Sequence, residues 1–166
     1  MCLLYKKKNK LYSKIYNLGD SRSVMCNKNN ISQQLSLDHK PNTYYEKKRI
    51  ENMGGKIYVD TENEWRVGLY SLWKWFGDFN EKMMSSEPDV FKYKIRKNKY
   101  IIMGCDGIWD VMTNQDAINF INEKIYIEKI DLKTNNLARE LANHCIKNKK
   151  STDNVSIVII YFVDNL

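Results

Sequence analysis

The sequence predicts an α+β fold, in which short strands joined by turns alternate with a few amphipathic helices. Two patterns support this prediction. Apolar and polar side chains alternate with a period of two in several short segments, and apolar residues recur at helical spacing in others. The chain has 166 residues, of which 43% are hydrophobic. It can therefore form one domain with its own core, or a large piece of a bigger domain.

The first part of the chain reads as strands and turns. Residues 11–18 alternate between apolar and polar side chains, which predicts a half-buried strand. The sequence GDSR at residues 19–22 predicts a turn, and residues 23–27 predict a second strand. Asn29 and Asn30 predict a further turn, so we expect these segments to form a hairpin meander.

A helix is predicted at residues 44–55. Thr43 is a candidate N-cap, and Gly54 and Gly55 end the helix because glycine readily adopts the backbone conformation of a helix C-terminus. Its apolar side chains are Tyr45, Ile50 and Met53. Residues 56–60 predict a short strand after this end.

The next segments combine two strands and a helix. Residues 89–95 alternate and predict a half-buried strand, whereas the continuous apolar run at 100–105 predicts a strand that is covered on both faces. Apolar residues at helical spacing predict a helix at 114–125, with Thr113 or Asn114 as its N-cap.

The C-terminal part predicts an amphipathic helix followed by a strand. The helix covers residues 135–150, and its apolar side carries Leu137, Leu141, His144 and Cys145. Residues 154–163 predict a buried strand. The four cysteines are scattered without the spacing of a zinc site, so we expect free thiols in a reducing compartment.

Composition narrows the classes of function. The formal net charge is +7, but the lysines are not interleaved with aromatic residues in a basic stripe. We therefore expect solvated lysine surfaces and no nucleic-acid site. No apolar segment is long enough to cross a bilayer, and the N-terminus lacks the core of a secretory signal. The expected location is the cytoplasm or the nucleus, without membrane attachment.

Three aspartates lie where predicted strands begin or end, and a fourth lies close to one of them. Asp106 follows the buried strand, Asp110 comes four residues later, Asp153 precedes the last strand, and Asp20 lies in the turn after the first. Clustered carboxylates repel one another, and a divalent cation relieves that repulsion. All-oxygen ligands favour Mg²⁺ or Mn²⁺. The alternative is that each aspartate is an ordinary turn or cap residue, and periodicity does not decide between the two.

Seven segments, in order, resemble the motifs of the metal-dependent serine/threonine protein phosphatases of type 2C. The resemblance extends from about residue 12 to residue 162, and CDGIWDVM and DNVSIVI are its most specific parts. The segments are YNLGDSRSVM, LDHKP, EKKRIENMGGKI, RVGLYSLWKWFGDF, SEPDV, YIIMGCDGIWDVM and STDNVSIVII. The resemblance implies a four-layer α-β-β-α sandwich of antiparallel sheets.

The resemblance also implies roles for the four aspartates. Asp106 and Asp153 match ligands of the paired catalytic metals, and Asp110 and Asp20 match ligands of a further, more weakly held metal. The implied reaction is the hydrolysis of phosphoserine and phosphothreonine in proteins by a metal-bound hydroxide. The implied cofactors are two or more Mg²⁺ or Mn²⁺ ions, and the implied partners are phosphoprotein substrates.

The sequence departs from the family pattern in two places. The N-terminal Asp-Gly-His-Gly-Gly segment has no counterpart, nor have the general-acid His and the phosphate-binding Arg, so no catalytic residue is assigned. We expect residues 1–166 to form a single, incomplete domain that the missing N-terminal portion would complete. The second departure is at Trp73 and Lys74, where the family usually has a small polar residue and an arginine. A catalytically inactive, phosphatase-like binding or regulatory module is the alternative function.

The two histidines are not assigned to catalysis. His39 lies in the DHKP segment, which in the family leads into a helix and does not supply the catalytic acid. His144 lies on the apolar side of the last predicted helix, where a packed histidine is expected.

Overall fold

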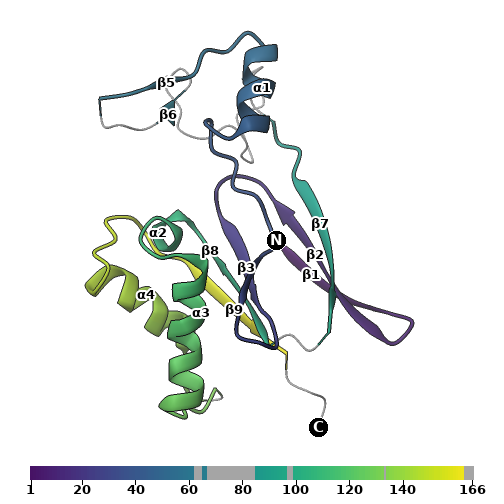
Figure 1. Cartoon of the computed structure of the whole chain (residues 1–166), viewed down its shortest axis with the longest axis vertical. Coiled ribbons are helices and arrows are strands. Elements are labelled where there is room, and N and C mark those ends of the chain that lie inside the picture. The colour runs from purple at the N-terminus through teal and green to yellow at the C-terminus, as the bar shows by residue number, and fades with distance from the viewer. Residues whose placement is uncertain (62–64, 67–84, 97–98, 133, 163–166) are drawn as a thin grey trace.

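Two antiparallel sheets face each other, and helices cover the outer side of one of them (Figure 1). The computed structural model describes residues 1–61, 65–66, 85–96, 99–132 and 134–162. Helices α2, α3 and α4 form the outer layer, next to the four-stranded sheet. These are three of the four layers that the resemblance implies, and the predicted α+β class is confirmed.

The first sheet has the strand order β1-β2-β7. Strand β1 (Cys2–Lys7) forms a hairpin with β2 (Lys10–Asn17), and β2 pairs with β7 (Asp89–Ile95) along its length. The hairpin turn consists of Lys8 and Asn9, whose φ angles are 47° and 55°. Two successive positive φ angles are typical of the tight turns whose twist matches that of the flanking strands.

The second sheet has the strand order β4-β3-β8-β9. Its strands are β3 (Arg22–Cys26), β4 (Ser32–Gln34), β8 (Tyr100–Gly104) and β9 (Ile157–Tyr161). Strand β8 is central and pairs with β3 on one side and β9 on the other. A separate two-stranded sheet joins β5 (Tyr58–Val59) to β6 (Trp65–Arg66).

The predicted hairpin meander is wrong in its first half. Strands β2 and β3 belong to different sheets, and only the β3-β4 hairpin forms as expected. The turn between β2 and β3 carries the chain from one sheet to the other, with Gly19 at a φ of 92°. A period of two predicts that a segment is a strand but does not specify its partner, which is chosen by contacts distant in sequence.

The helices on the four-stranded sheet are α2 (Asp106–Trp109), α3 (Asn114–Asn122) and α4 (Leu137–Lys147), and α3 continues as a π-helical turn, η1 (Glu123–Ile127). Thr113, one of the two residues predicted for this role, is the N-cap of α3. Its side chain accepts a hydrogen bond from the Asp116 N–H, and the Asp116 carboxylate accepts one from the Thr113 N–H. This capping box satisfies two N–H groups that the helix itself leaves unbonded.

Helix α1 (Tyr44–Asn52) begins where the sequence predicts and ends three residues before the predicted bound, and only one of its three apolar side chains is buried. Gly54 has a φ of 82°, and the N–H of Gly55 donates to the Ile50 carbonyl at 2.9 Å, which closes the helix end. Ile50 is buried, whereas Tyr45 and Met53 are exposed. Glu46 is buried in their place, because Arg49 pairs with its carboxylate at 2.7 Å.

Alternation along the strands divides the core in two. Val24, Cys26 and Ile102 face the helices, whereas Met25 and Ile101 face the other sheet. The prediction that β8 is covered on both faces is therefore confirmed. Strand β9 is only partly buried, which corrects the prediction of a buried last strand. It lies at the sheet edge within the part of the chain described, and its Val158 is 57% exposed.

The remaining predictions concern the thiols, membrane spans and the segment that contains Trp73 and Lys74. The four cysteines are free. Among the helices described, none is long and apolar enough to cross a membrane. Trp73 and Lys74, where the sequence departs from the family pattern, lie outside the described residues.

Candidate functional site

Asp106 is the first residue of α2, and only Cys105 separates it from the end of β8, an inner strand of its sheet. The chain turns at this point, and the lack of a side chain at Gly107 lets it pack closely against the loop that leads into β9. A Cβ atom at residue 107 would overlap the carbonyl oxygen of Asn154. Ser151 of the same loop donates to the Gly107 carbonyl at 2.8 Å, and the Trp109 indole N–H donates to the Gly104 carbonyl at 2.9 Å. These contacts hold Asp106 at the mouth of β8, as predicted.

Three of the four predicted aspartates line one pocket, which has a volume of about 300 Å³. Asp106 and Asp110 reach it from α2, and Asp20 reaches it from the turn between β2 and β3. The other lining residues are Lys40, Pro41, Asn42 and Trp65. We call this cavity the acid pocket. Its carboxylates come from segments more than 80 residues apart in sequence, so the fold assembles the group.

The charged groups of the acid pocket are close enough to shift one another's pKa. Burial raises the pKa of Asp20 to about 6, and the nearby charge of Asp106 adds to this effect. Lys40 opposes it, and donates to Asp110 Oδ1 at 3.0 Å. Burial alone would lower the pKa of Lys40, but Asp110, Asp20 and Asp38 outweigh it and the pKa is raised. A half-buried carboxylate facing another acid is a favourable ligand for a cation.

Asp153 does not line the acid pocket. Its side chain is exposed and accepts a hydrogen bond from the Asn154 N–H at 2.6 Å, in the loop that packs against Gly107. Across the residues that the structure describes, no three His, Cys, Asp or Glu side chains are grouped closely enough to hold a metal ion. The carboxylate oxygens of the three aspartates in the acid pocket are nevertheless the donor type that a hard cation prefers, although Lys40 also lines the pocket.

His39 lies outside the lining of the acid pocket and holds two segments together. Its ring is buried, Nδ1 accepts the Gly19 N–H at 3.0 Å, and Nε2 lies 3.1 Å from Asp89 Oδ2. Because Nδ1 accepts a hydrogen bond, the ring carries its N–H at Nε2. This N–H donates a hydrogen bond to the Asp89 carboxylate. The reading of His39 as a structural residue is therefore supported. His144 packs against Phe120 with ring centroids 4.7 Å apart, as expected of a packed histidine.

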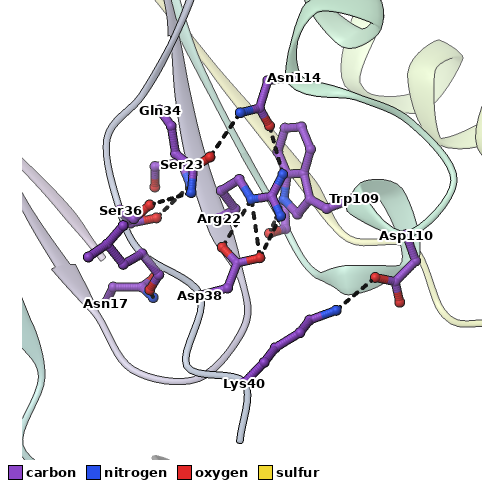
Figure 2. Close-up of polar contacts among 12 residues, drawn as sticks. Asn17, Arg22, Ser23, Gln34, Ser36, Asp38, Lys40, Trp109, Asp110 and Asn114 are labelled. Atoms are coloured by element: carbon purple, nitrogen blue, oxygen red, sulfur yellow. Dashed lines mark hydrogen bonds and ion pairs between the residues drawn. The ribbon is translucent and has the colours of Figure 1, made fainter. Parts of the chain in front are cut away.

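Sequence reasoning missed two basic residues at the site. Lys40, from DHKP, enters the acid pocket, and Arg22, from GDSR, forms a cluster of polar contacts beside it (Figure 2). Both motifs were identified, but only Asp20 of GDSR was matched to a metal ligand, and no residue of DHKP was assigned a role. Their positions in the sequence were the available signal: Lys40 lies two residues after Asp38, and Arg22 lies two residues after Asp20.

Comparisons with known proteins show the family to which the chain is similar. The family Protein phosphatase 2C matches residues 1–155, a match that includes β1. A PP2C-like domain-containing protein, R307, of Acanthamoeba polyphaga mimivirus is 36% identical over 89% of this chain and 93% of its own length. The "Probable protein phosphatase 2C 4" of Paramecium tetraurelia is 35% identical over 93% of this chain and 54% of its own length.

A solved structure shows the same fold. The crystal structure of a phosphatase from Toxoplasma gondii superimposes with a TM-score of 0.81 at 26% identity, and the match covers 92% of this chain and 49% of that one. The chain thus spans about half the length of the Paramecium and Toxoplasma phosphatases it matches. With a family match over nearly all of its residues, the chain belongs to the protein phosphatase 2C family.

Proposed function

We propose that this chain takes part in the metal-dependent hydrolysis of phosphoserine and phosphothreonine in proteins, as part of a larger type 2C phosphatase domain. Membership of the family supports the serine/threonine phosphatase class. The observation that carries the proposal for this chain is the acid pocket. Two separate segments bring Asp20, Asp106 and Asp110 together, although this costs charge repulsion within a folded protein.

In this proposal the ions are Mg²⁺ or Mn²⁺, and each aspartate has a distinct role. Asp106, with Asp153, would hold the catalytic ions, whereas Asp110 and Asp20 would hold a peripheral one. When bound, such ions would lower the pKa of the attacking water and offset the negative charge of the phosphate. The chain's own residues then orient these carboxylates. The α2–loop contacts at Gly107 bring Asp106 and the Asp153-bearing loop to the same end of the second sheet.

Titration of the chain with Mn²⁺ by calorimetry tests this proposal. We expect saturable binding that is weakened by Asp106→Asn and unchanged by Glu123→Gln, a charge-matched control on the exposed surface of η1. Absence of Mn²⁺ binding to the unaltered chain would contradict the metal site. Release of phosphate from a phosphothreonine peptide is then measured on the chain alone and on the chain extended by the N-terminal half of the Paramecium relative. We expect turnover only from the extended protein.

An inactive, phosphatase-like binding module is the second candidate. The ion pair between Lys40 and Asp110 favours it, because the protein itself neutralises part of the charge in the acid pocket. Such a module would bind a phosphopeptide equally well in Mn²⁺ and in chelator, and the extended protein would release no phosphate. Metal-dependent phosphate release would exclude this alternative.

A further inference from the structure

Arg22 lies beside the acid pocket but does not line it. It is the first residue of β3, two residues after Asp20, and its side chain is only 19% exposed. Neither the family-motif assignment of the acids nor the proposed reaction gives this guanidinium a role. Its contacts join four separate segments of the chain.

The guanidinium holds a carboxylate on one side and an amide on the other (Figure 2). Nε donates to both oxygens of Asp38, at 3.0 and 3.2 Å, and Nη2 donates to Asp38 Oδ2 at 2.5 Å. Nη1 donates to Asn114 Oδ1 at 2.8 Å, at the start of α3. The Asn114 amide in turn donates to Gln34 Oε1 of β4 at 2.9 Å. An arginine fork bound in this way has a defined orientation.

The same guanidinium packs on α2. Its central carbon lies 5.3 Å from the centre of the Trp109 ring, within the range of a cation–π contact. Trp109 is itself fixed, because it is buried and its indole N–H donates to the Gly104 carbonyl. Arg22 therefore links β3, the segment before α1, α2 and the start of α3.

Three of these four segments place the linking residue within two positions of a residue of the acid pocket. Asp38 is two residues from Lys40, Trp109 is adjacent to Asp110, and Arg22 is two residues from Asp20. We propose that Arg22 is a positioning residue, which fixes the spacing of the acid-pocket carboxylates and thereby sets their affinity for a divalent cation. This inference rests on the proposed function.

The direction in which metal affinity changes when Arg22 is replaced separates a positioning role from a purely electrostatic one. Arg22 is a cation near a site for cations, so removing its charge should strengthen metal binding if charge alone mattered. Positioning predicts the opposite, because carboxylates that are free to separate under their own repulsion bind an ion less tightly. A loss of affinity in Arg22→Met is therefore not explained by the lost charge.

The experiment measures Mn²⁺ affinity by calorimetry and the free energy of unfolding by circular dichroism in chelator. We expect Arg22→Met to lower the affinity about ten- to a hundredfold, the usual range for residues that orient metal ligands. Arg22→Lys should recover only part of the loss, because a lysine cannot reproduce the two-pronged contact with Asp38. Asn114→Ala leaves every charge in place and should give a smaller loss.

A matched control separates positioning from general destabilisation. Arg49 pairs with Glu46 on α1, and these side chains are 24% and 8% exposed, compared with 19% and 11% for Arg22 and Asp38. Arg49→Met should therefore destabilise the fold comparably but leave Mn²⁺ affinity unchanged.

The outcomes are distinguishable. If the unaltered chain binds no Mn²⁺, the proposed function fails. If it binds and Arg22→Met binds as tightly or more tightly, only the positioning role fails. Should Arg22→Met not fold, Arg22→Lys and Asn114→Ala decide the question, and unchanged affinity in both would overturn the inference.

Discussion

The ammonium group of Lys40 lies 3.0 Å from Oδ1 of Asp110, so a lysine from the segment before α1 supplies a counter-charge to an acid at the end of α2. Both side chains are about half exposed, and the pair therefore contributes little to stability. Its consequence is local. A divalent cation that binds Asp110 must displace Lys40 or share the carboxylate with it.

Replacing Lys40 should strengthen metal binding, which is the opposite of the effect expected for Arg22. We expect Lys40→Met to raise Mn²⁺ affinity severalfold at low ionic strength, and the gain should shrink as salt screens the charges. Calorimetry at two salt concentrations measures both effects. Lys47→Met is the control, since Lys47 pairs with Glu51 on α1 at 3.9 Å. Equal or weaker binding by Lys40→Met would show that the lysine does not compete.

Removing the charge of Asp20 should stabilise the metal-free protein. Because burial and Asp106 raise the pKa of Asp20 from 3.8 to about 6, the folded state holds this proton more tightly than the unfolded state does. The stability that Asp20 contributes is therefore present below about pH 4 and is lost as the pH rises towards 6.

Thermal unfolding in chelator tests this expectation for Asp20→Asn. The variant should unfold at a higher temperature at pH 7, by up to about 2–4 °C, the change expected of about 1 kcal/mol in a domain of this size. The stability of the variant should also not decline between pH 4 and pH 6, and the variant should bind Mn²⁺ more weakly. If Asp20→Asn melts at a lower temperature than the unaltered chain at pH 7, the charge of Asp20 does not destabilise the metal-free fold.

A methyl group at residue 107 should disturb the contact between α2 and the loop before β9. Gly107→Ala places its Cβ against the Asn154 carbonyl, and backbone on both sides must shift. We expect a loss of about 1–3 kcal/mol in the free energy of unfolding, typical of overpacking. Mn²⁺ affinity should also fall, because Asp106 and Asp153 lie on the two segments that separate.

Gly54→Ala provides the comparison for this prediction. Gly54 has a positive φ but open space around it, so the variant should lose about 1 kcal/mol through backbone strain alone. Its Mn²⁺ affinity should be unchanged. Urea unfolding of both variants measures the difference, and equal metal binding by Gly107→Ala and the unaltered chain would argue against coupling between the loop and α2.

His39 should matter for stability and not for proton transfer. In His39→Ala the buried Gly19 N–H loses its acceptor and the contact with Asp89 is lost, so the free energy of unfolding should fall by about 2–4 kcal/mol. His144→Ala, on a partly exposed ring, should cost less. Urea unfolding of the two variants checks the order. A larger effect of His144→Ala would refute the structural role of His39.

Local signals in the sequence located most elements correctly. The alternation in residues 89–95 and the apolar run at 100–105 predicted β7 and β8 within one residue, and the Thr113 cap predicted the start of α3. These features depend on neighbours along the chain, since side-chain periodicity and helix capping involve residues only a few positions apart. The family motifs likewise identified the four candidate aspartates.

The sequence by itself thus determined the class of most segments, although not of β1 or α2, and the candidate aspartates, while the tertiary structure decided what lies together. It placed β2 and β3 in different sheets, buried Glu46 instead of Tyr45, and brought Asp20 to Asp106 but left Asp153 outside the pocket. It also enclosed Arg22 among groups from three other segments. Such contacts join residues that are distant in sequence, and their free energy depends on packing and charge across space, which no local pattern records.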